Sequence, residues 1–534
     1  MVALTTHHLI SPASLPPYSP VPPTPIPGLA EAETATTNNN DNEYLSVLSY
    51  NVLLPNSVDG WWNYKMYLPP LFSSSSSSST TTSNDDVVTD ISSWDYRRNL
   101  LRERIGLIDA DVVCFQEVSP LSFEEDFAFM KEDLGYDGCE LFKKGRFRPA
   151  TFWKTRKCDL VGAPVHKDRT LLTAFRVVSK KDDATGTATA EEKKEDKNSS
   201  KEDKKWYVLN CHLQAGSQGG RRVRQIHEGM RAVFTLAKKL KEKDPKSPNL
   251  IVCGDFNGGP ECGAVKYIEE GFISPDFIED GEPVTSKLKE SPLSLPLLDA
   301  MNVPEIQRKD KNPPPPTLVV PELISLLVEI DESLSEEDRK TAYENPCLSK
   351  DAKERLERIY RRYATFSSSS SEQQTTDDAT TMNISDVERW LIDINGRVGR
   401  GSEFRNAAKE MGWVEPVDVE DEALSDGESK GGGGAKKEKA RIVLPQDGIL
   451  SLEGFVNVYE SELREGKFWG IAHDLAVMGE ALPDAGVFES RYDRMYCSAS
   501  LHPFAVLDTV STVPCPNKSE PSDHLPIAAS FVPR

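Results

Sequence analysis

The sequence predicts an α/β layered sandwich that is interrupted by a separate helical region. Short apolar runs with β-branched and aromatic residues, bounded by turn residues, recur near both ends of the chain, and such runs are typical of buried strands. Amphipathic stretches alternate with some of these runs, as helices packed on a sheet do. Between residues 321 and 475, in contrast, strand-like runs are few and apolar residues follow helical spacing.

The expected elements follow from this periodicity, taken in chain order. Strands are expected at residues 44–54, 112–115, 150–153, 173–178, 206–213, 249–253 and 525–531. Two amphipathic helices accompany them, at residues 97–108 and 222–240. Four more helices are expected in the helical region, at residues 356–363, 385–392, 402–411 and 452–463.

Composition then divides the chain into five parts. Residues 1–43 are rich in proline and threonine and contain no Lys or Arg, so we expect a disordered tail. The sandwich is expected in two pieces, at residues 44–280 and 485–534. An acidic, proline-rich linker at 281–320 and a helical insert at 321–475 separate the two pieces.

The sequence shows no sign of export or of membrane insertion. No run approaches the roughly 18 apolar residues of a membrane span, and the first residues lack the apolar core of a signal peptide. The nine cysteines are scattered without a C-x-x-C pair, which indicates neither a zinc knuckle nor a disulfide framework. We therefore expect a cytoplasmic or nuclear protein without a membrane span.

Charge alone leaves the class of partner open. The net charge of −22 argues against a nucleic-acid partner for the chain as a whole. Residues 141–157, however, contain seven basic residues and no acidic one, and a local basic surface can bind phosphate within an acidic protein. A solvated surface explains these charges equally well.

Six polar side chains lie where expected strands begin or end, and together with His212 and Asp493 they have the types that suit metal-assisted hydrolysis of a phosphoester. That reaction needs a hard cation, an activated water and groups that stabilise the charged transition state. A single carboxylate after a strand is most often a turn former or a helix cap, but six polar groups at strand ends in one α/β chain predict a common site. The set comprises Asn51, Glu117, His212, Asp255, Asn257, Asp493, Asp523 and His524.

The segments around these residues carry a family resemblance. In chain order they read S-Y-N-V-L, Q-E-V, N-C-H-L, G-D-F-N, R-Y-D-R-M-Y and S-D-H-L-P. Together they resemble the endonuclease/exonuclease/phosphatase superfamily. The resemblance implies a four-layered α/β/β/α sandwich, of the metal-dependent phosphohydrolase type, with Mg²⁺ at one edge and Mn²⁺ as an alternative ion.

The resemblance also implies a role for each residue. Glu117 would be the principal metal carboxylate, with Asn51 and Asp523 beside the metal. Asp255 would position or deprotonate the attacking water.

The remaining roles concern the phosphate. His212 and Asn257 would hold the scissile phosphate, and Asp493 would orient His524, which would stabilise the phosphorane. His212 has an alternative explanation as a strand histidine with an internal partner.

Within the superfamily the chain is most similar to the deadenylase and nocturnin-like branch. The segments W-D-Y-R-R, G-Y-D-G, P-A-T-F-W-K and G-D-F-N-G-G-P support this similarity. One departure is Arg494, because the family has an aromatic residue after the aspartate, and we expect this arginine near the substrate. Basic residues expected to bind substrate are Arg148, Lys154, Arg221 and Arg224.

The helical insert contains two stretches that resemble EF-hand loops, at residues 393–398 and 447–455. Both lack the first aspartate and the bidentate glutamate that Ca²⁺ needs. We therefore expect an EF-hand-like module that binds a protein partner or serves a structural role, and no Ca²⁺ at the insert.

These observations favour a Mg²⁺-dependent phosphodiesterase, a 3′-exoribonuclease of the deadenylase type that hydrolyses RNA. One alternative is a phosphatase or phosphodiesterase acting on phosphorylated small molecules, namely nucleotides, inositol phosphates or lipid headgroups. A second is an interaction protein that has lost activity.

Overall fold

The computed structural model of the 534-residue chain describes most of the expected elements. The predicted tail at 1–43 and much of the predicted linker lie outside the described residues. The described residues are 44–57, 61–67, 91–142, 145–178, 204–279, 281–283, 296–303, 313–329, 346–364, 381–414, 442–507 and 509–534.

The chain forms two compact units. The first comprises Met1–Tyr64, Thr80–Pro321 and Val487–Arg534, and the second comprises Lys65–Ser79 and Glu322–Gly486. Among the described residues, no helix is both long enough and apolar enough to cross a membrane.

One sheet of the first unit has six strands, in the order β16-β17-β1-β2-β4-β3. Strands β1 and β2 are parallel, and every other neighbouring pair is antiparallel. The strands are β1 (Leu45–Asn51), β2 (Val112–Val118), β3 (Gly138–Leu141), β4 (Arg148–Trp153), β16 (Leu501–Leu507) and β17 (Ile527–Pro533).

The other sheet follows the order β12-β15-β9-β8-β7-β5, and β6 pairs with β7. Strands β8 and β9 are parallel, like the central pair of the first sheet. The strands are β5 (Cys158–Leu160), β6 (Val165–Lys167), β7 (Thr170–Val177), β8 (Lys205–His212), β9 (Asn249–Asp255), β12 (Leu298–Asp299) and β15 (Asp493–Cys497). Strands β15 and β16 were not expected from the sequence, because polar residues and Pro503 interrupt their apolar pattern.

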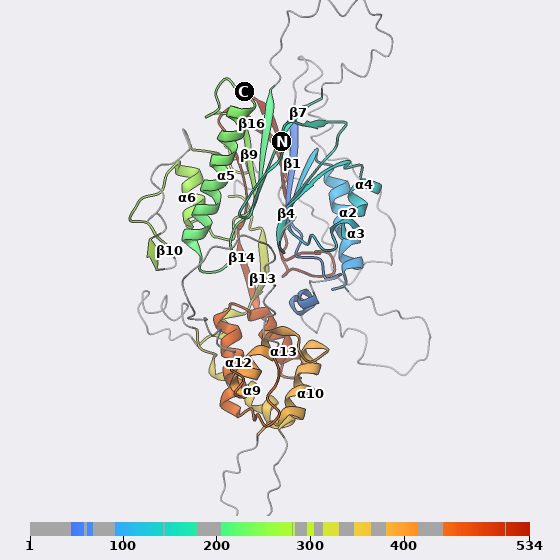
Figure 1. The fold of residues 1–534 in the computed structure, drawn as a ribbon, viewed down its shortest axis with the longest axis vertical. Helices are drawn as coiled ribbons and strands as arrows, with labels where there is room; N and C mark the ends of the chain where they lie inside the picture. The colour runs from blue at the N-terminus through green and yellow to red at the C-terminus, as the bar shows by residue number, and fades with distance from the viewer. Residues whose placement is uncertain are drawn as a thin grey trace, which may run out of the picture. The chain divides into compact units, whose positions relative to one another are not determined.

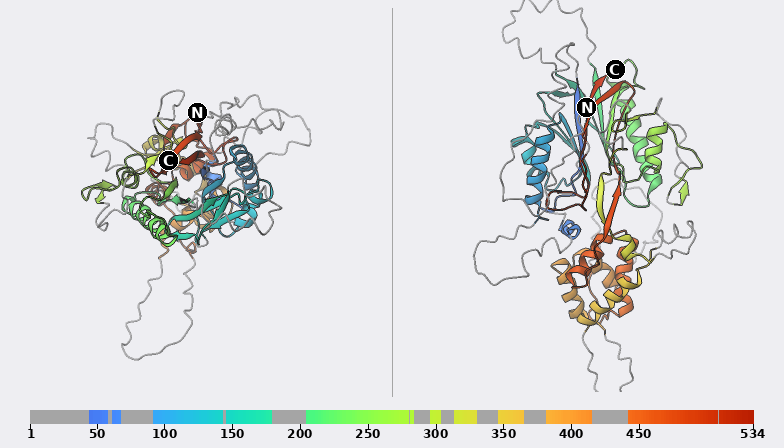
Figure 2. Two further views of the ribbon diagram at one scale, coloured as in Figure 1. Left: turned by 90° about the horizontal axis from the view of Figure 1, so that it is seen from above. Right: turned by 180° about the vertical axis from the view of Figure 1, so that it is seen from behind.

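Helices cover the outer face of each sheet (Figures 1 and 2). Helices α2 (Trp94–Ile108), α3 (Phe123–Asp126) and α4 (Ala128–Glu132) flank the first sheet. Helices α5 (Gly219–Lys239) and α6 (Gly263–Glu270) flank the second. The predicted four-layered α/β/β/α sandwich is therefore confirmed.

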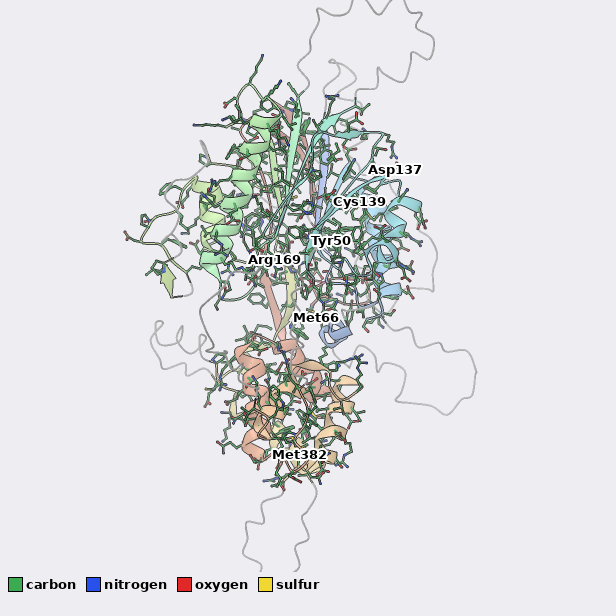
Figure 3. All side chains as sticks on the ribbon, in the orientation of Figure 1. Tyr50, Met66, Asp137, Cys139, Arg169 and Met382 are labelled. Atoms are coloured by element: carbon green, nitrogen blue, oxygen red, sulfur yellow. The ribbon has the colours of Figure 1, made fainter. Side chains whose placement is uncertain are left out.

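Strand alternation explains where the cores lie, because successive side chains of a strand point to opposite faces. In β1, Leu45 and Val47 pack between the two sheets, whereas Leu48 and Tyr50 pack under the outer helices. Side chains fill both layers (Figure 3).

Shorter elements complete the described secondary structure. They are the 3₁₀ helix η1 (Trp61–Met66) and the strand pairs β10 (Ile278–Glu279) with β11 (Glu282–Pro283) and β13 (Leu318–Glu322) with β14 (Gly486–Ser490). Helix η1 and the β13–β14 pair extend across the boundaries between the units.

The second unit is helical and has its own core. Trp390, Phe455 and Tyr459 pack edge to face at its centre, and the Trp390 indole donates a hydrogen bond to the Tyr459 hydroxyl (3.2 Å). Its helices are α7 (Ile324–Leu327), α9 (Lys350–Tyr363), α10 (Ile384–Asn395), α11 (Gly401–Glu410), α12 (Leu452–Arg464) and α13 (Phe468–Val477).

The first of the two stretches likened to EF-hand loops, residues 393–398, is helical in its first half and a loop in its second half. Residues 393–395 form the last turn of α10, which starts at a capping box between Asn383 and Asp386 and ends at Gly396 in the left-handed region. A backbone bridge instead pairs Met382, before α10, with Leu450, before α12. Gly396 explains the difference, because its left-handed conformation ends α10 after residues 393–395 and not before them.

Candidate active site

Strand alternation brings four of the predicted residues to one end of the layer between the sheets. Asn51 is on the same face of β1 as Val47, and Asp255 is on the same face of β9 as Ile251 and Cys253. The same parity places His212 on β8 and Asp493 on β15 at this end. The register pairs Asp493 with Asp255, and Asp255 with His212. These four residues are buried, with at most 3 % of their surface exposed.

Glu117 reaches the same place by breaking the alternation. Its neighbours Phe115 and Val118 both pack under the outer helices, and the pairing of β2 with β4 shifts register between them. Glu117 itself has φ +63°, so this bulge re-aims its side chain. The Glu117 carboxylate accepts hydrogen bonds from the Leu54 amide (3.1 Å) and from Asn51 Nδ2 (3.4 Å).

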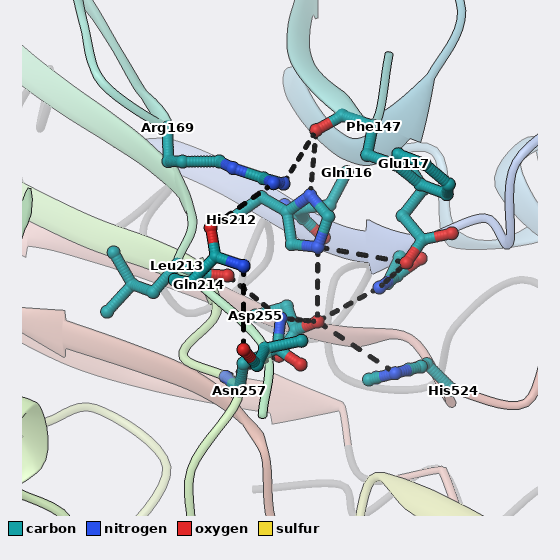
Figure 4. A network of polar contacts seen from close by, with 12 residues as sticks. Gln116, Glu117, Phe147, Arg169, His212, Leu213, Gln214, Asp255, Asn257 and His524 are labelled. Carbon is teal, nitrogen blue, oxygen red and sulfur yellow. Dashed lines mark hydrogen bonds and ion pairs between the residues drawn. The ribbon is translucent and has the colours of Figure 1, made fainter. Parts of the chain in front are cut away.

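Asp255 is the centre of the polar network (Figure 4). Its Oδ2 accepts hydrogen bonds from Asn51 Nδ2 (3.0 Å) and Asn257 Nδ2 (2.9 Å). The Nε2 atoms of His212 and His524 lie 3.7 Å and 3.9 Å from the same oxygen. Burial raises the pKa of Asp255, and the charge of a neighbouring aspartate acts in the same direction.

His524 is paired with Asp493. Its Nδ1 lies 2.7 Å from Asp493 Oδ2. Burial by itself lowers the pKa of His524, but the charges of Asp493, Asp255 and Asp523 outweigh this and raise that pKa well above its ordinary value. His524 is therefore an imidazolium at neutral pH and presents a positive Nε2–H towards Asp255.

His212 is in the opposite state. Its Nδ1 donates a hydrogen bond to the Phe147 carbonyl oxygen (2.9 Å). Burial lowers the pKa of His212 to about 4, so the neutral ring keeps an unprotonated Nε2. That Nε2 lies 3.7 Å from both Glu117 Oε1 and Asp255 Oδ2.

The end of the site around Glu117 fits a divalent cation. Burial raises the pKa of Asp523, and the negative charge of Glu117 contributes in the same direction, so these two carboxylates repel each other. The unprotonated Nε2 of His212 faces Glu117 as well. Hard cations prefer oxygen ligands, which the two carboxylates supply. Asn51 donates hydrogen bonds from Nδ2 to the carboxylates of Glu117 and Asp255, and its Oδ1 accepts one from the Leu53 amide. In this orientation Asn51 positions the carboxylates, and its oxygen is not directed to the cation.

A second group of possible metal ligands comprises Asp255, Asp493 and His524, whose ligand atoms lie within 4.8 Å of one another. A ligand imidazole needs an unshared electron pair. Because His524 holds its proton, this group suits proton transfer and charge stabilisation better than metal binding.

Backbone strain concentrates at the site. Among the described residues, seven residues other than glycine have a positive φ, and five of them surround this network. Such conformations cost roughly 1–3 kcal/mol each and cluster at functional sites. The five are Leu53 (φ 49°), Glu117 (63°), Phe147 (54°), Arg169 (63°) and Asn257 (48°).

Comparison with known proteins identifies the family of the chain. The profile of the Endonuclease/Exonuclease/phosphatase family matches residues 48–524. The chain belongs to this family. The predicted resemblance is thereby confirmed, and the family is one of enzymes that cleave phosphoric esters.

Individual relatives are distant. The chain is 28% identical over 224 residues to the CCR4-Not complex 3′-5′-exoribonuclease subunit Ccr4 of Schizosaccharomyces pombe, covering 34% of this chain and 31% of that protein. It is 25% identical over 219 residues to 2′,5′-phosphodiesterase 12 of Mus musculus, covering 38% and 34%. The chain thus matches about a third of the length of these relatives.

Solved structures show a more distant likeness. ANGEL2, described as a 2′,3′-cyclic phosphatase in complex with adenosine-2′,3′-vanadate, is 16% identical with a TM-score of 0.40. The match covers 92% of this chain and 96% of that one.

Not every basic residue expected to bind substrate lies near the candidate site. Arg148 and Arg221 lie beside it, around Asp168, and Arg224 is exposed on α5. Lys154, however, follows the far end of β4, where it is buried and its Nζ lies 2.5 Å from Asp109 Oδ1. The prediction for Lys154 is wrong, because the strand separates it from the site and an internal carboxylate neutralises it.

Arg494 also lies elsewhere than expected. It follows Asp493 on β15, so alternation sends it to the opposite face, together with Tyr496 under α6. It is buried there, at 3% exposure. Arg494 therefore does not replace an aromatic residue at the substrate.

Three residues of the network were not singled out from the sequence. Gln116 and Asn210 join the two sheets below the site through a 2.9 Å hydrogen bond, and they lie inside the Q-E-V and N-C-H-L segments. Arg169 lies beside His212, where its guanidinium donates a hydrogen bond to the Phe147 carbonyl (3.4 Å). No sequence signal marked Arg169, because it stands alone in a short turn.

Proposed function

We propose that the chain is a divalent-metal-dependent phosphodiesterase that removes nucleotides from the 3′ ends of RNA. One observation carries the proposal: an imidazolium, His524, and a carboxylate, Asp255, face each other beside the carboxylates Glu117 and Asp523. This arrangement supplies a base, a positive group and a cation site within one cluster of polar groups. The name of the Schizosaccharomyces pombe relative, a 3′-5′-exoribonuclease, supports RNA as the substrate.

Asp255 acts on the attacking water. Two amides, Asn51 and Asn257, hold its carboxylate in place, so it accepts a hydrogen bond from a water without rearranging. Its raised pKa makes it a better proton acceptor than an exposed aspartate.

His524 stabilises the phosphorane through its protonated Nε2, because Asp493 holds both the orientation and the charge of the ring. The amide of Asn257 and the ring of His212 flank the same space and position the phosphate between them.

The cation site is assigned to Glu117 and Asp523, with Mg²⁺ as the proposed ion and Mn²⁺ as a substitute. When bound, the cation neutralises charge on the phosphate and lowers the pKa of a bound water. For the helical insert, which folds with its own core, the proposal is a module that binds a protein partner or serves a structural role.

A second candidate concerns the linkage that is cleaved. The murine relative is named 2′,5′-phosphodiesterase 12, and the same side chains serve a 2′,5′ bond. Phosphatase action on a nucleotide or an inositol phosphate uses this chemistry as well.

The test follows a 5′-labelled oligonucleotide that ends in a run of adenosines, with Mg²⁺ and with EDTA. We expect a ladder that shortens from the 3′ end, requires the metal, and disappears in Glu117→Gln. Glu125→Gln, a change at an exposed glutamate of α3, should leave the ladder unchanged.

Two other outcomes redirect the proposal. Faster cleavage of a 2′,5′-linked oligoadenylate would replace the 3′-exoribonuclease assignment with the second candidate. If neither the 5′-labelled oligonucleotide nor the 2′,5′-linked oligoadenylate is cleaved, while phosphate is released from nucleotides, the nuclease assignment is contradicted.

A further inference from the structure

Three arginines lie together around Asp168, and one of them, Arg169, lies beside His212. Arg169 follows β6, Arg148 begins β4, and Arg221 lies in the first turn of α5. The Arg169 guanidinium donates hydrogen bonds to the Phe147 carbonyl and to Gln214 Oε1, both at 3.4 Å. The Phe147 carbonyl also accepts the hydrogen bond of His212 Nδ1. Arg169 and the His212 ring, which flanks the scissile phosphate in the proposed function, therefore share one hydrogen-bond acceptor, the Phe147 carbonyl oxygen (Figure 4).

The three arginines of this cluster face two carboxylates, Asp168 and Glu117, so the described residues balance its positive charge only in part. Among the described residues, the cluster forms one ion pair, in which Arg221 Nη2 lies 3.4 Å from Asp168 Oδ2. The buried Nε atoms of Arg148 and Arg221 have no hydrogen-bond partner in the described part of the chain. Burial lowers the pKa of Arg169, and the charge of Arg148 lowers it further. Guanidinium groups held this close repel one another unless an anion lies between them.

The backbone holds the cluster in place at a conformational cost. Arg169 and Phe147 both have positive φ, at 63° and 54°. The carbonyl of Arg169 accepts a hydrogen bond from the His212 amide (2.9 Å), which ties this turn to β8. The Arg148 guanidinium carbon lies over the Phe142 ring, 4.8 Å from its centre.

We propose that Arg148, Arg169 and Arg221 form a subsite for a second phosphate of the substrate, adjacent to the scissile one. The ligand is a backbone phosphate of a single-stranded RNA, bound by planar guanidinium groups that match two phosphate oxygens at once. The inference rests on the proposed function, because that function places the scissile phosphate between His212 and Asn257. It goes further by making the enzyme prefer substrates with a phosphate on the neighbouring nucleotide.

The test compares two substrates in the full-length protein with Mg²⁺. One is a short oligoadenylate, and the other is bis(p-nitrophenyl) phosphate, which has a single phosphate. The variant Arg169→Asn removes the guanidinium, and asparagine tolerates the left-handed backbone at this position. Arg148→Gln is a second variant at an ordinary backbone angle. Arg231→Ala, at an exposed arginine of α5, is the matched control.

We expect Arg169→Asn to lower the ratio of kcat/KM for the oligoadenylate to kcat/KM for the small diester by about 10- to 100-fold, the range of a charge-assisted hydrogen bond. Arg148→Gln should lower the ratio in the same direction. The plot of log kcat/KM against log salt for the oligoadenylate should become shallower by about 0.7, since one phosphate contact is lost on a single strand. Arg231→Ala should leave the ratio unchanged.

An equal loss on both substrates, or no loss on either, would overturn the subsite. Failure of the proposed function has a different signature, because the wild-type protein would then hydrolyse neither substrate in the presence of Mg²⁺.

Discussion

At the scale of single residues, the site depends on which protons are held and which are released. His212 and His524 lie on either side of Asp255 Oδ2, at 3.7 Å and 3.9 Å, yet their pKa values move in opposite directions. The difference comes from their partners. A carbonyl oxygen accepts the Nδ1 hydrogen of His212, whereas a carboxylate faces Nδ1 of His524.

These directions predict a bell-shaped dependence of kcat/KM on pH. Asp255 must be deprotonated to act as a base, so activity should fall as pH drops through its raised pKa, above the ordinary 3.8. His524 must be protonated, so activity should fall as pH rises through its raised pKa, above the ordinary 6.5. A profile recorded from pH 4 to 11 in one series of buffers checks both limbs.

Asp493→Asn tests the source of the alkaline limb. Loss of the carboxylate removes the largest effect that raises the pKa of His524, so the alkaline limb should move to lower pH and kcat should fall roughly 100- to 10,000-fold. Asp137→Asn, at an exposed position (Figure 3), is the control. An alkaline limb that stays in place would show that another group titrates there.

At the scale of elements, the bulge in β2 and the close contact of β8 with β9 build the site. Gly254 has φ +133°, and a Cβ there would lie 1.9 Å from the Cys211 carbonyl oxygen. Because this contact is between backbones, neither strand can give way without moving His212 or Asp255.

Gly254→Ala should therefore destabilise the first unit by more than about 3 kcal/mol, as strained or overpacked backbone positions do. Gly259→Ala is the matched control, since a Cβ there meets nothing within 4 Å. Urea denaturation followed by tryptophan fluorescence measures the difference. Equal midpoints for the two variants would contradict the expected clash.

The stability of the helical unit depends on a buried cluster of ion pairs. Lys65 Nζ lies 2.8 Å from Glu403 Oε1 and 3.0 Å from Asp474 Oδ1, and all three side chains are buried. Lys65→Met leaves two buried carboxylates without this cation, which should cost about 3–5 kcal/mol.

Amide hydrogen exchange in α11 and α13 measures this loss, since these helices carry Glu403 and Asp474. Lys350→Met, at an exposed lysine of α9, should leave exchange unchanged. Unaltered protection in Lys65→Met would mean that the two carboxylates find other compensation.

At the scale of the whole molecule, the cation is expected to stabilise the folded chain, because the unfolded chain cannot bring Glu117 and Asp523 together. Mg²⁺ at 100 times its dissociation constant should add about 2.7 kcal/mol to the free energy of unfolding. The melting temperature should rise with Mg²⁺ concentration in the wild-type protein and stay constant in Glu117→Gln. An identical rise in both proteins would place the stabilising ion elsewhere.

The sequence by itself determined the residue types of the site and the layered fold. Apolar runs located most of the central strands, and the polar residue after each run marked the strand end, because strand periodicity and burial are local properties of the chain. The motifs around Asn51, Asp255 and His524 identified the family, which its match to residues 48–524 confirmed.

Only the tertiary structure decided which groups meet. It showed that a bulge turns Glu117 towards the site, that Arg169 lies beside His212, and that Lys154 lies at the wrong end of its strand. The physical reason is that these placements depend on strand register and on pairing between distant segments. A single residue added by a bulge reverses which face a side chain occupies, and no local pattern in the sequence records it.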